Sequence, residues 1–557
     1  MDNENILSQF KLPIEYVQNS KLNVDIINDL ELGGETSLYK FLFNNQTNLG
    51  NIMTCKWCSY YTTNTHFLSD FQILMKKYKH TDLIDYNYYK QWNEFKNQTA
   101  FKEKYSFIEW EHLEFCNKSS KFLQLVTIYN LTSPIISLII PIVFLIMPFI
   151  IVKFVMKAPI TFDIYKSLLY KQFRNHAFGK LIKEFSSRDN WDKKVYALAI
   201  GAFYIFSLYQ NVLSCYKFYK NIYRIQKFLY LTKQHICYSL NTIDTFLTHI
   251  EKLGSFNGFT QDLLERKQQL LHTQTLIQHI HNEKFNIRNI HNIGTYMSNF
   301  YTIFYDKEIS DTIEYSFGLL GFLDNLNGLK KHIVERRINK CSFGKKTRLK
   351  KQYYLPHIMS PHVSNSINLD KKYMITGPNA SGKTTILKST LLNLIFSQQI
   401  GFGCYKTATI NPYNFFYSYL NIPETSGRDS LFQAEARKCL DILKNIQSHS
   451  HLRHFCIFDE LYSGTNPQEA IIAAKSYLLY LSELKVSFML TTHYHKVCSI
   501  HKKDKSIVNK QMLCSINNDI IDYKYKLVDG ISYIKGGLNV LYDLEYPTEI
   551  THQIKTL

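Results

Sequence analysis

The chain has 557 residues, of which 45% are hydrophobic and 20% charged, with only 21 Gly and 12 Pro. This composition excludes a disordered, collagen-like or low-complexity protein, and the length has room for several domains. Lys and Arg outnumber Asp and Glu by 65 to 46, a formal net charge of +19. Such a charge favours polyanionic partners, either nucleic acid or an anionic membrane face.

The eleven cysteines lie along the chain without the spacing of a disulfide framework, which favours reduced thiols in an interior compartment. Cys55 and Cys58 form a lone CxxC pair. A zinc site needs a second pair at suitable spacing, and none lies nearby. We therefore expect packed thiols and no zinc.

The first long apolar run follows a region over residues 1–121 that we expect to be helical. Ile135–Val152 is eighteen consecutive uncharged residues, enough to cross most of a bilayer core. The alternative is a buried helix of a soluble protein. Pro134, Pro141 and Pro148 argue against it, because an interior proline removes a helix hydrogen bond and membrane helices tolerate this better. The run predicts a membrane segment.

A second uncharged run, Val195–Tyr216, is less apolar and is either a second span or an amphipathic or core helix. The loop between the runs, residues 153–194, carries ten Lys and Arg against four carboxylates. The positive-inside rule places this loop in the cytosol, yet two full spans would put it opposite a cytosolic C-terminal half. A re-entrant pair, or one span plus an interfacial helix, resolves the conflict. Residues 122–216 are thus expected to hold the membrane segments.

Residues 217–352 have few prolines and Leu and Ile at helical spacing, which predicts a mostly helical region. It ends in a basic linker, residues 330–351, with ten Lys and Arg and one Glu. This linker is either a contact for nucleic-acid or lipid phosphates or a solvated connection to the next domain.

The clearest chemistry lies in residues 353–557. A short apolar strand, Tyr373–Thr376, runs into a GxxxxGK[ST] loop that an apolar helical pattern follows. In such a loop, glycines allow backbone N–H groups to wrap phosphates at a helix N-terminus. Lys383 is expected to reach the β- and γ-phosphates of ATP, and Thr384 to bind Mg²⁺. The expected ATP-binding residues are Gly377, Pro378, Asn379, Ala380, Ser381, Gly382, Lys383, Thr384 and Thr385.

Two further apolar strands end in polar side chains. His454–Phe458 leads into Asp459 and Glu460, and Val486–Leu490 leads towards His493. Asp459 fits the acid on the Mg²⁺ side, and Glu460 fits the group that orients or deprotonates the attacking water. His493 is placed to hydrogen-bond the γ-phosphate. We therefore expect an ATP hydrolase with Glu460, His493 and Lys383 as its catalytic residues.

Four segments resemble the MutS-family ATPase, which is of the ABC type: Thr376–Thr385, Ser426–Ala436, Phe458–Ala470 and Thr491–Val497. The resemblance extends over roughly residues 354–546, with a weaker echo of the family's helical core at residues 37–72. It implies an α/β P-loop ATPase domain, a mostly parallel sheet with flanking helices. An all-α core and lever region with an inserted transmembrane segment or hairpin would precede this domain.

The family also implies a site shared by two protomers of a homodimer. Ser430 is the best match to the serine that acts in trans, and Ser426 is the nearby alternative. Asn379 would also face the partner, and His362 stands where relatives place an aromatic group that stacks on adenine. A helix N-terminus and a hydroxyl would then reach the γ-phosphate only when the dimer closes.

The sequence departs from the MutS family in features that bear on its predicted function. The chain resembles a short, membrane-associated MutS-like protein, without room before the core-like segment for a mismatch-recognition domain. We expect ATP binding and hydrolysis to drive dimer closure on DNA, as in mismatch repair or recombination, with the ATPase domain cytosolic and tethered to a membrane. The alternative is a membrane-anchored ATPase that moves membrane segments or a partner without recognising DNA.

Overall fold

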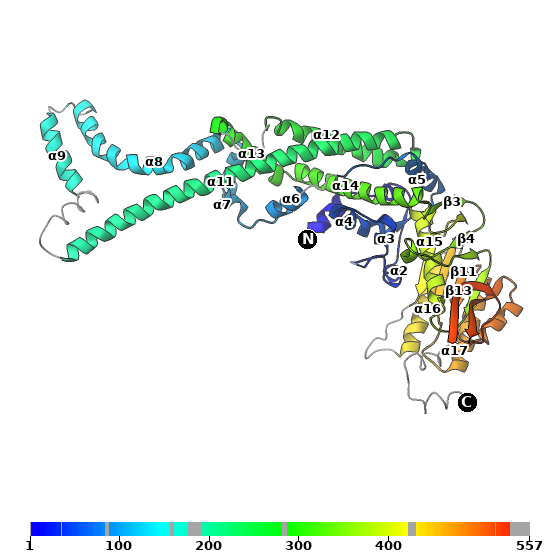
Figure 1. Cartoon of the computed structure of the whole chain (residues 1–557). Helices are drawn as coiled ribbons and strands as arrows, with labels where there is room; N and C mark the ends of the chain where they lie inside the picture. The colour runs from blue at the N-terminus through cyan, green and yellow to red at the C-terminus, as the bar shows by residue number, and fades with distance from the viewer. Residues whose placement is uncertain are drawn as a thin grey trace. The chain divides into compact units, whose positions relative to one another are not determined.

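The computed structural model describes residues 2–34, 36–83, 88–155, 157, 161–175, 191–280, 287–420, 430–517 and 520–534. The chain divides into two compact units. The first comprises residues 1–85, 241–267 and 314–557, and the second comprises residues 86–240 and 268–313. Three helices contribute residues to both units: α11 (Trp191–Ile250), α12 (Asn257–Leu276) and α14 (Lys307–Val334) (Figure 1).

The second unit is helical in its described residues. Its other helices are α6 (Tyr88–Lys96), α7 (Phe101–Lys104), η2 (Glu111–Lys118), α8 (Ser120–Ile150), η3 (Ile151–Val155), α9 (Phe162–Asn175), η5 (Ile287–Asn292) and α13 (Ile293–Tyr305). Their core is aromatic: the rings of Trp92 and Phe304 lie 5.0 Å apart, and those of Phe95 and Phe228 lie 4.7 Å apart. Aromatic packing of this kind gives a small helical unit a large buried apolar area.

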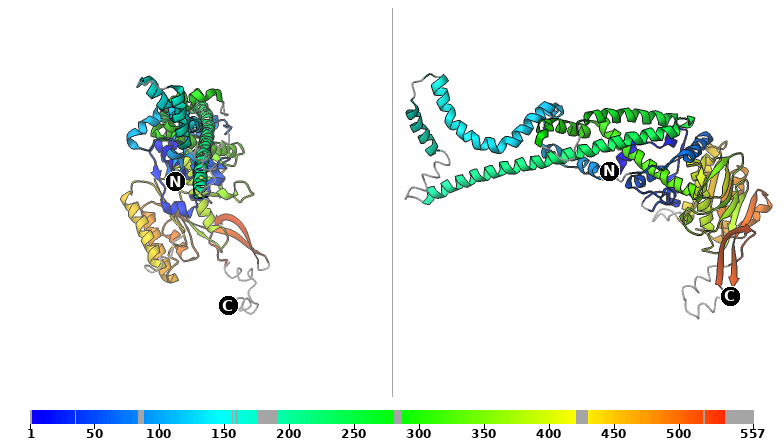
Figure 2. Two further views of the ribbon diagram at one scale, coloured as in Figure 1. Left: turned by 90° about the vertical axis from the view of Figure 1, so that its left-hand side faces the viewer. Right: turned by 45° about the horizontal axis from the view of Figure 1, so that its top comes forward.

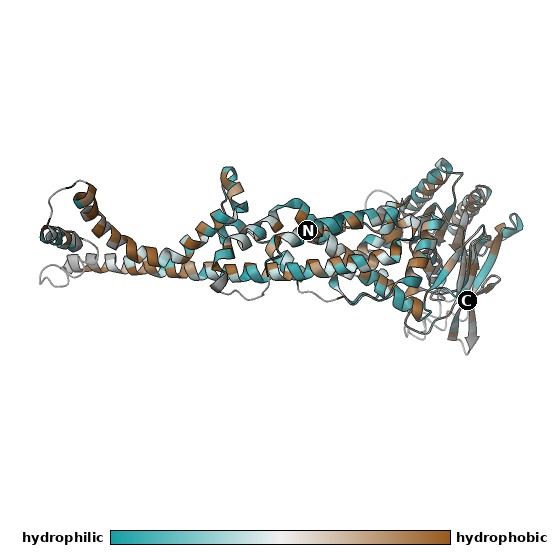
Figure 3. Ribbon diagram, turned by 90° about the horizontal axis from the view of Figure 1, so that it is seen from above, coloured by the Kyte–Doolittle hydropathy of each residue, from teal (hydrophilic) through white to brown (hydrophobic). Residues whose placement is uncertain are grey.

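Helix α8 contains most of the first apolar run. Its segment Ser120–Ile140 has a mean hydropathy of 1.6, is 11% buried, and is the one helix among the described residues that is long and apolar enough to cross a membrane. In Figure 3 the ribbon of this helix is coloured mostly as hydrophobic. The second run lies in α11, where Phe203 and Ile205 are 74% and 66% exposed.

The first unit begins with short helices and one small sheet. These elements are α1 (Asp2–Gln9), η1 (Pro13–Tyr16), β1 (Ser20–Lys21), α2 (Val24–Asp29), α3 (Tyr39–Phe43), α4 (Asn48–Trp57), β2 (Tyr60–Tyr61), α5 (Thr65–Lys77) and η4 (Gly254–Phe256). Asp324 of α14 joins them to the later chain, because its carboxylate accepts hydrogen bonds from the backbone N–H groups of Gln46 and Thr47.

A six-stranded sheet forms the centre of the first unit, in the order β13-β12-β6-β11-β10-β9. Its strands are β6 (Lys372–Thr376), β9 (Phe415–Tyr419), β10 (His454–Asp459), β11 (Ser487–Thr491), β12 (Ile507–Asn517) and β13 (Ile520–Asp529). All neighbours are parallel except β12 and β13, which form an antiparallel pair at one edge (Figure 2). The prediction of a mostly parallel sheet is confirmed.

Helices cover this sheet because its central strands are apolar on both faces. The covering helices are α15 (Lys383–Gln399), α16 (Leu431–Ser448), α17 (Pro467–Glu483) and η7 (Val497–Lys502). Ile442 of α16 and Leu478 of α17 pack with Phe458 of β10 in one buried cluster. The flanking helices expected from the sequence are therefore present.

A second sheet combines three strands that precede the loop of residues 377–382 with two that follow α15. It has five strands in the order β5-β4-β8-β3-β7. These are β3 (Asn339–Phe343), β4 (Arg348–Gln352), β5 (Asn365–Asn368), β7 (Phe402–Gly403) and β8 (Thr407–Ile410), with the short turn η6 (Leu355–His357). Helix α15 packs between the two sheets: Gln352 donates a hydrogen bond to Thr390 of α15 at 2.6 Å. The basic segment of residues 330–351 thus ends as two strands.

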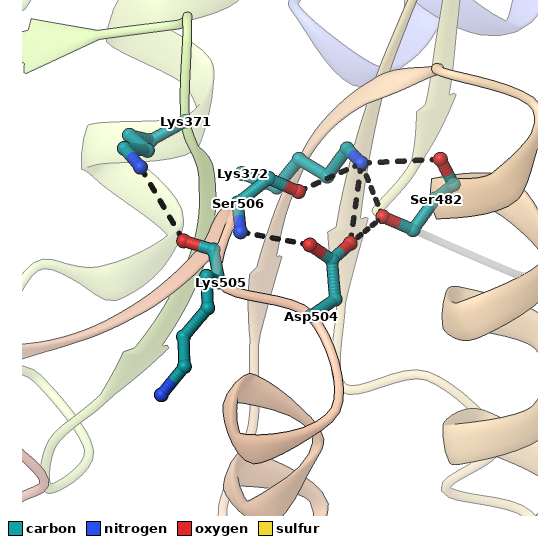
Figure 4. A network of polar contacts seen from close by, with 6 residues as sticks. All are labelled: Lys371, Lys372, Ser482, Asp504, Lys505 and Ser506. Carbon is teal, nitrogen blue, oxygen red and sulfur yellow. Dashed lines mark hydrogen bonds and ion pairs between the residues drawn. The ribbon is translucent and has the colours of Figure 1, made fainter.

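A polar network fixes the amino ends of β6 and β12 (Figure 4). Lys372 Nζ donates to Ser482 O at 3.2 Å and to Ser506 Oγ at 3.0 Å, and it lies 3.5 Å from Asp504 Oδ2. Desolvation raises the pKa of Asp504, but hydrogen bonds from Ser482 and Ser506 together with the Lys372 charge hold that pKa below its usual value. These contacts hold the amino-terminal ends of the strands in place. The loops that follow the strands leave from the opposite end of the sheet.

Candidate active site

The carboxyl ends of three neighbouring strands meet at one edge of the six-stranded sheet. Asp459 of β10 pairs in register with Thr491 of β11, and Thr491 pairs with Ile375 of β6. In a parallel sheet, loops that leave this edge converge. The loops after Thr376, Asp459 and Thr491 therefore bring the polar residues predicted from the sequence together.

The loop between β6 and α15 has the backbone of a phosphate-binding loop. Gly382 has a φ of +90°, in the left-handed region that favours glycine, and α15 begins at the next residue. Ser381 Oγ donates to Pro378 O at 2.7 Å and closes the turn. A side chain at Gly377 would approach Ser381 Oγ to 2.8 Å, so the loop needs glycine there as well.

Lys383 is the buried cation of this loop. It is 6% exposed, and its Nζ donates to Gly377 O at 3.1 Å and to Pro378 O at 3.2 Å. Burial lowers the pKa of Lys383, whereas the negative charges of Glu460 and Asp459 raise it. The ammonium group is therefore held inside the loop, where an anion would replace the solvation that it has lost.

Asp459 and Thr384 offer adjacent oxygen ligands. Thr384 Oγ1 donates to Asp459 Oδ2 at 2.7 Å, and the hydroxyl of Thr491 donates to the other carboxylate oxygen. Mg²⁺ prefers carboxylate, hydroxyl and phosphate oxygens, so this donor set fits the ion expected from the sequence. Asp459 is the last residue of β10 and contacts Thr384.

Glu460 occupies a strained turn directly after β10. Its φ is +51°, a left-handed conformation uncommon for a residue other than glycine, and its N–H donates to Thr491 O at 3.1 Å. His493 Nε2 lies 3.0 Å from Glu460 Oε1 and 3.2 Å from Lys383 Nζ. The hydrogen bond from His493 lowers the pKa of Glu460, so this carboxylate stays ionised at neutral pH.

A cavity of about 810 Å³ opens beside these groups. Its volume lies within the roughly 300–1,000 Å³ typical of ligand pockets. The predicted residues that line it are Asn379, Ala380, Gly382, Lys383, Thr384, Thr385, Glu460 and His362. The other predicted residues Gly377, Pro378, Ser381, Asp459 and His493 support the lining groups through the contacts given above.

His362 forms one wall of the cavity with Tyr353. Their rings stack with centroids 3.9 Å apart and planes at 16°. Sequence reasoning singled out His362 but missed Tyr353, Met512 and Tyr525, which also line the cavity. Met512 and Tyr525 belong to β12 and β13, far along the chain, and no motif marks them.

Ser430 lies outside the cavity lining, at the start of α16. Its hydroxyl accepts a hydrogen bond from Gln433 N at 3.3 Å, and Gln433 Oε1 accepts one from Ser430 N at 3.1 Å. This capping box fixes the helix N-terminus. Ser430 is exposed, whereas the alternative Ser426 lies outside the described residues.

A buried carboxylate joins α16 to the loop after Glu460, a feature that the sequence did not reveal. Glu435 is 2% exposed and accepts hydrogen bonds from Ser463 N at 3.1 Å, Ser463 Oγ at 2.9 Å and Gly464 N at 3.1 Å. A side chain at Gly464 would come within 2.8 Å of Phe432 N. The helix that carries Ser430 is thus packed directly on the loop that follows Glu460.

The C-terminal part of the chain is similar to known proteins. Residues 373–557 match the family model described as MutS domain V. A DNA mismatch repair protein MutS of Orientia tsutsugamushi (strain Ikeda) is 28% identical over 204 residues, which are 35% of this chain and 22% of that protein. The corresponding protein of Persephonella marina is 23% identical over 241 residues, 42% of this chain and 27% of that protein.

An Endonuclease MutS2 of Thermus thermophilus is 25% identical over 256 residues, which are 45% of this chain and 33% of that protein. In each of these three matches the aligned part spans a third or less of the relative's own length. The match to MutS domain V, residues 373–557, includes the cavity residues Lys383, Thr384 and Glu460.

Proposed function

We propose that residues 373–557, which match the family model described as MutS domain V, form an ATPase domain, and that this chain binds and hydrolyses ATP at the cavity beside the loop that follows β6. One observation carries the proposal: Lys383, Thr384 and Glu460 line the same cavity, with Asp459 and His493 bonded behind them. A structural role alone would not require a buried lysine, two adjacent carboxylates and a phosphate-binding loop at one edge.

Each residue has a separable role in the proposed reaction. Lys383 binds the β- and γ-phosphates, while Thr384 and Asp459 hold Mg²⁺. When bound, the ion would neutralise negative charge on the phosphoryl oxygens. Glu460, kept ionised, orients the attacking water and accepts its proton. His493 holds Glu460 in place through Nε2, next to the site proposed for the γ-phosphate.

The same geometry supports a site that two copies complete. Ser430 stands at the exposed N-terminus of α16, where backbone N–H groups attract an anion, and it does not line the cavity of its own chain. Its hydroxyl would reach the γ-phosphate of ATP bound to a second copy. Asn379 would face the same second copy. Glu435 then ties that contact to the loop after Glu460, so closure of a dimer and hydrolysis are linked.

We further propose that the ATPase acts on DNA while it is tethered to a membrane. The DNA role rests on the similarity to relatives that are DNA mismatch repair proteins. The tether rests on α8, whose Ile135 and Leu138 are 58% and 53% exposed. Exposed apolar side chains at this density favour lipid over water. The ATPase domain would face the cytosol, where ATP is supplied.

The exposed apolar surface of α8 also favours a second candidate. In that case the chain is a membrane-anchored ATPase that moves membrane segments or a partner and does not recognise DNA. The proposed ATPase itself is tested by ATP turnover of the purified full chain against Lys383→Ala. Turnover that survives this substitution would remove the cavity from the reaction.

A further inference from the structure

The five-stranded sheet has one apolar face and one basic face. Cys341, Leu349, Ile367 and Ala408 form a row across β3, β4, β5 and β8, and each is at most 7% exposed. Because successive side chains of a strand point to opposite faces, their neighbours Lys340, Ser342, Arg348 and Lys350 lie on the other face, and all four are exposed.

The strand register places these cations close together. Arg348 pairs with Thr409, Lys350 pairs with Thr407, and Ser342 pairs with Thr409. Arg348 and Lys350 are two residues apart on one strand, about 7 Å. Continuing the β3–β8 register puts Lys340 beside Thr407, so Lys340 and Lys350 are two strands apart, about 10 Å. We call Lys340, Arg348 and Lys350, with the hydroxyls of Ser342, Thr407 and Thr409, the basic face.

Little negative charge offsets the basic face. Arg348 lies 3.3 Å from Asp370, and within the described part of the chain neither Lys340 nor Lys350 forms an ion pair. Further cations flank the sheet: Lys345 and Lys346 in the turn between β3 and β4, and Lys406 before β8, are exposed. Of the ten cations in residues 330–351, Lys340, Arg348 and Lys350 therefore lie on one face of the sheet, and Lys345 and Lys346 lie in the adjoining turn.

The chemistry of this face matches a sugar–phosphate backbone. Arg, Lys, Ser and Thr side chains are those that contact phosphate oxygens without reading bases. None of the large apolar side chains exposed in the described residues lies on β3, β4, β5 or β8. A peripheral membrane contact commonly adds such apolar groups. The composition therefore favours nucleic acid over a lipid surface.

We propose that the basic face is a contact surface for the phosphate backbone of duplex DNA, independent of base sequence. The inference rests on the proposed action on DNA and adds its location. It also gives a route to the ATP site, because β4 continues from Lys350 to Gln352, and both Gln352 and Tyr353 line the cavity. DNA bound on this face would contact β4, the strand that leads into the cavity wall.

The test is the salt dependence of duplex DNA binding by the full chain in detergent. Each phosphate contact contributes about −0.9 to the slope of log K against log salt. Lys340→Ala, Arg348→Ala and Lys350→Ala combined should make the slope shallower by about 2 to 3. The matched control combines Lys444→Ala, Lys502→Ala and Lys503→Ala, three exposed lysines of the same unit, and should leave the slope unchanged.

Without DNA, the rate of ATP turnover should be equal in the unaltered chain and in all these variants. An equal rate reports that each variant has folded correctly. Lys340→Gln with Lys350→Gln keeps the Arg348–Asp370 pair and should lose about 2 units of slope even if the triple variant misfolds. DNA binding with the same slope in basic-face and control variants would overturn the inference. No DNA binding by the unaltered chain would instead overturn the proposed action on DNA. Loss of binding to anionic vesicles alone would assign the face to a membrane.

Discussion

His493 Nε2 lies 3.0 Å from Glu460 Oε1 and 3.2 Å from Lys383 Nζ. A single ring nitrogen cannot donate a proton to the carboxylate and accept one from the ammonium group at the same time. The proton on His493 therefore decides which of its two neighbours is bonded. This places the histidine between Lys383, the proposed phosphate-binding group, and Glu460, the proposed base.

His493→Ala should move the acid limb of the pH–rate profile. The hydrogen bond from His493 lowers the pKa of Glu460, so removing it raises that pKa towards its ordinary value. Glu460 then becomes protonated at a higher pH as the solution is acidified, and turnover begins to fall earlier. The measurement is kcat from neutral pH down to the acid limit, with Glu460→Gln as the control. An acid limb at the same pH in both His493→Ala and the unaltered chain would contradict this coupling.

Glu460→Gln should separate ATP binding from hydrolysis. The amide keeps the shape of the side chain but cannot accept a proton, and losing a general base commonly costs about 10²- to 10⁴-fold in rate. ATP binding should persist, so the chain should accumulate as an ATP-bound dimer in sedimentation experiments. Normal turnover by Glu460→Gln would remove this residue from its role, whatever the oligomeric state.

Ser430 should act on the site of the partner. Ser430→Gly removes the hydroxyl while costing the helix cap only a few tenths of a kcal/mol. One mixed dimer would carry Lys383→Ala in one copy and Ser430→Gly in the other. A second would carry both substitutions in one copy and none in the other. If Ser430 acts in trans, the first dimer keeps one working site and the second has none; the reverse pattern would show action in cis.

Apolar side chains of α8 should hold the chain in a membrane. Ile135→Asp with Leu138→Asp places two charges on exposed positions of this helix, each costing about 2.5–3.5 kcal/mol near a bilayer centre. The full chain should then be released from membranes by alkaline extraction. Leu264→Asp with Leu271→Asp, at exposed positions of α12, serves as the control. Equal extraction of both variants and the unaltered chain would contradict a membrane tether.

The sequence predicted the parts of the fold that local pattern determines. Apolar strands that end in Asp459 or in the loop after Thr376 mark a parallel sheet, and the loop glycines mark the phosphate site. The second sheet was missed because the charges around Lys340 and Lys350 hid the alternation with Cys341 and Leu349. The charges of residues 330–351 form one continuous run in the sequence. In the structure, burial separates the apolar face of the two strands from their charged face.

Contacts between distant segments could not be predicted from the sequence. Glu435 appears there as one more acid on an amphipathic helix, and only the fold brings it to Ser463 and Gly464. Tyr353, directly after β4, and Tyr525 of β13 reach the cavity for the same reason. Tertiary packing, not local propensity, decides which of these residues line the cavity.

The most direct test of the account is ATP turnover by the full chain in detergent at one stated salt concentration. Turnover would be compared without addition, with duplex DNA, with branched DNA and with anionic vesicles, using Glu460→Gln as the control in each condition. The account predicts that DNA raises turnover and that Glu460→Gln stays inactive throughout. Turnover raised by vesicles and indifferent to both DNAs would contradict it, and the ATPase would then serve the membrane alone.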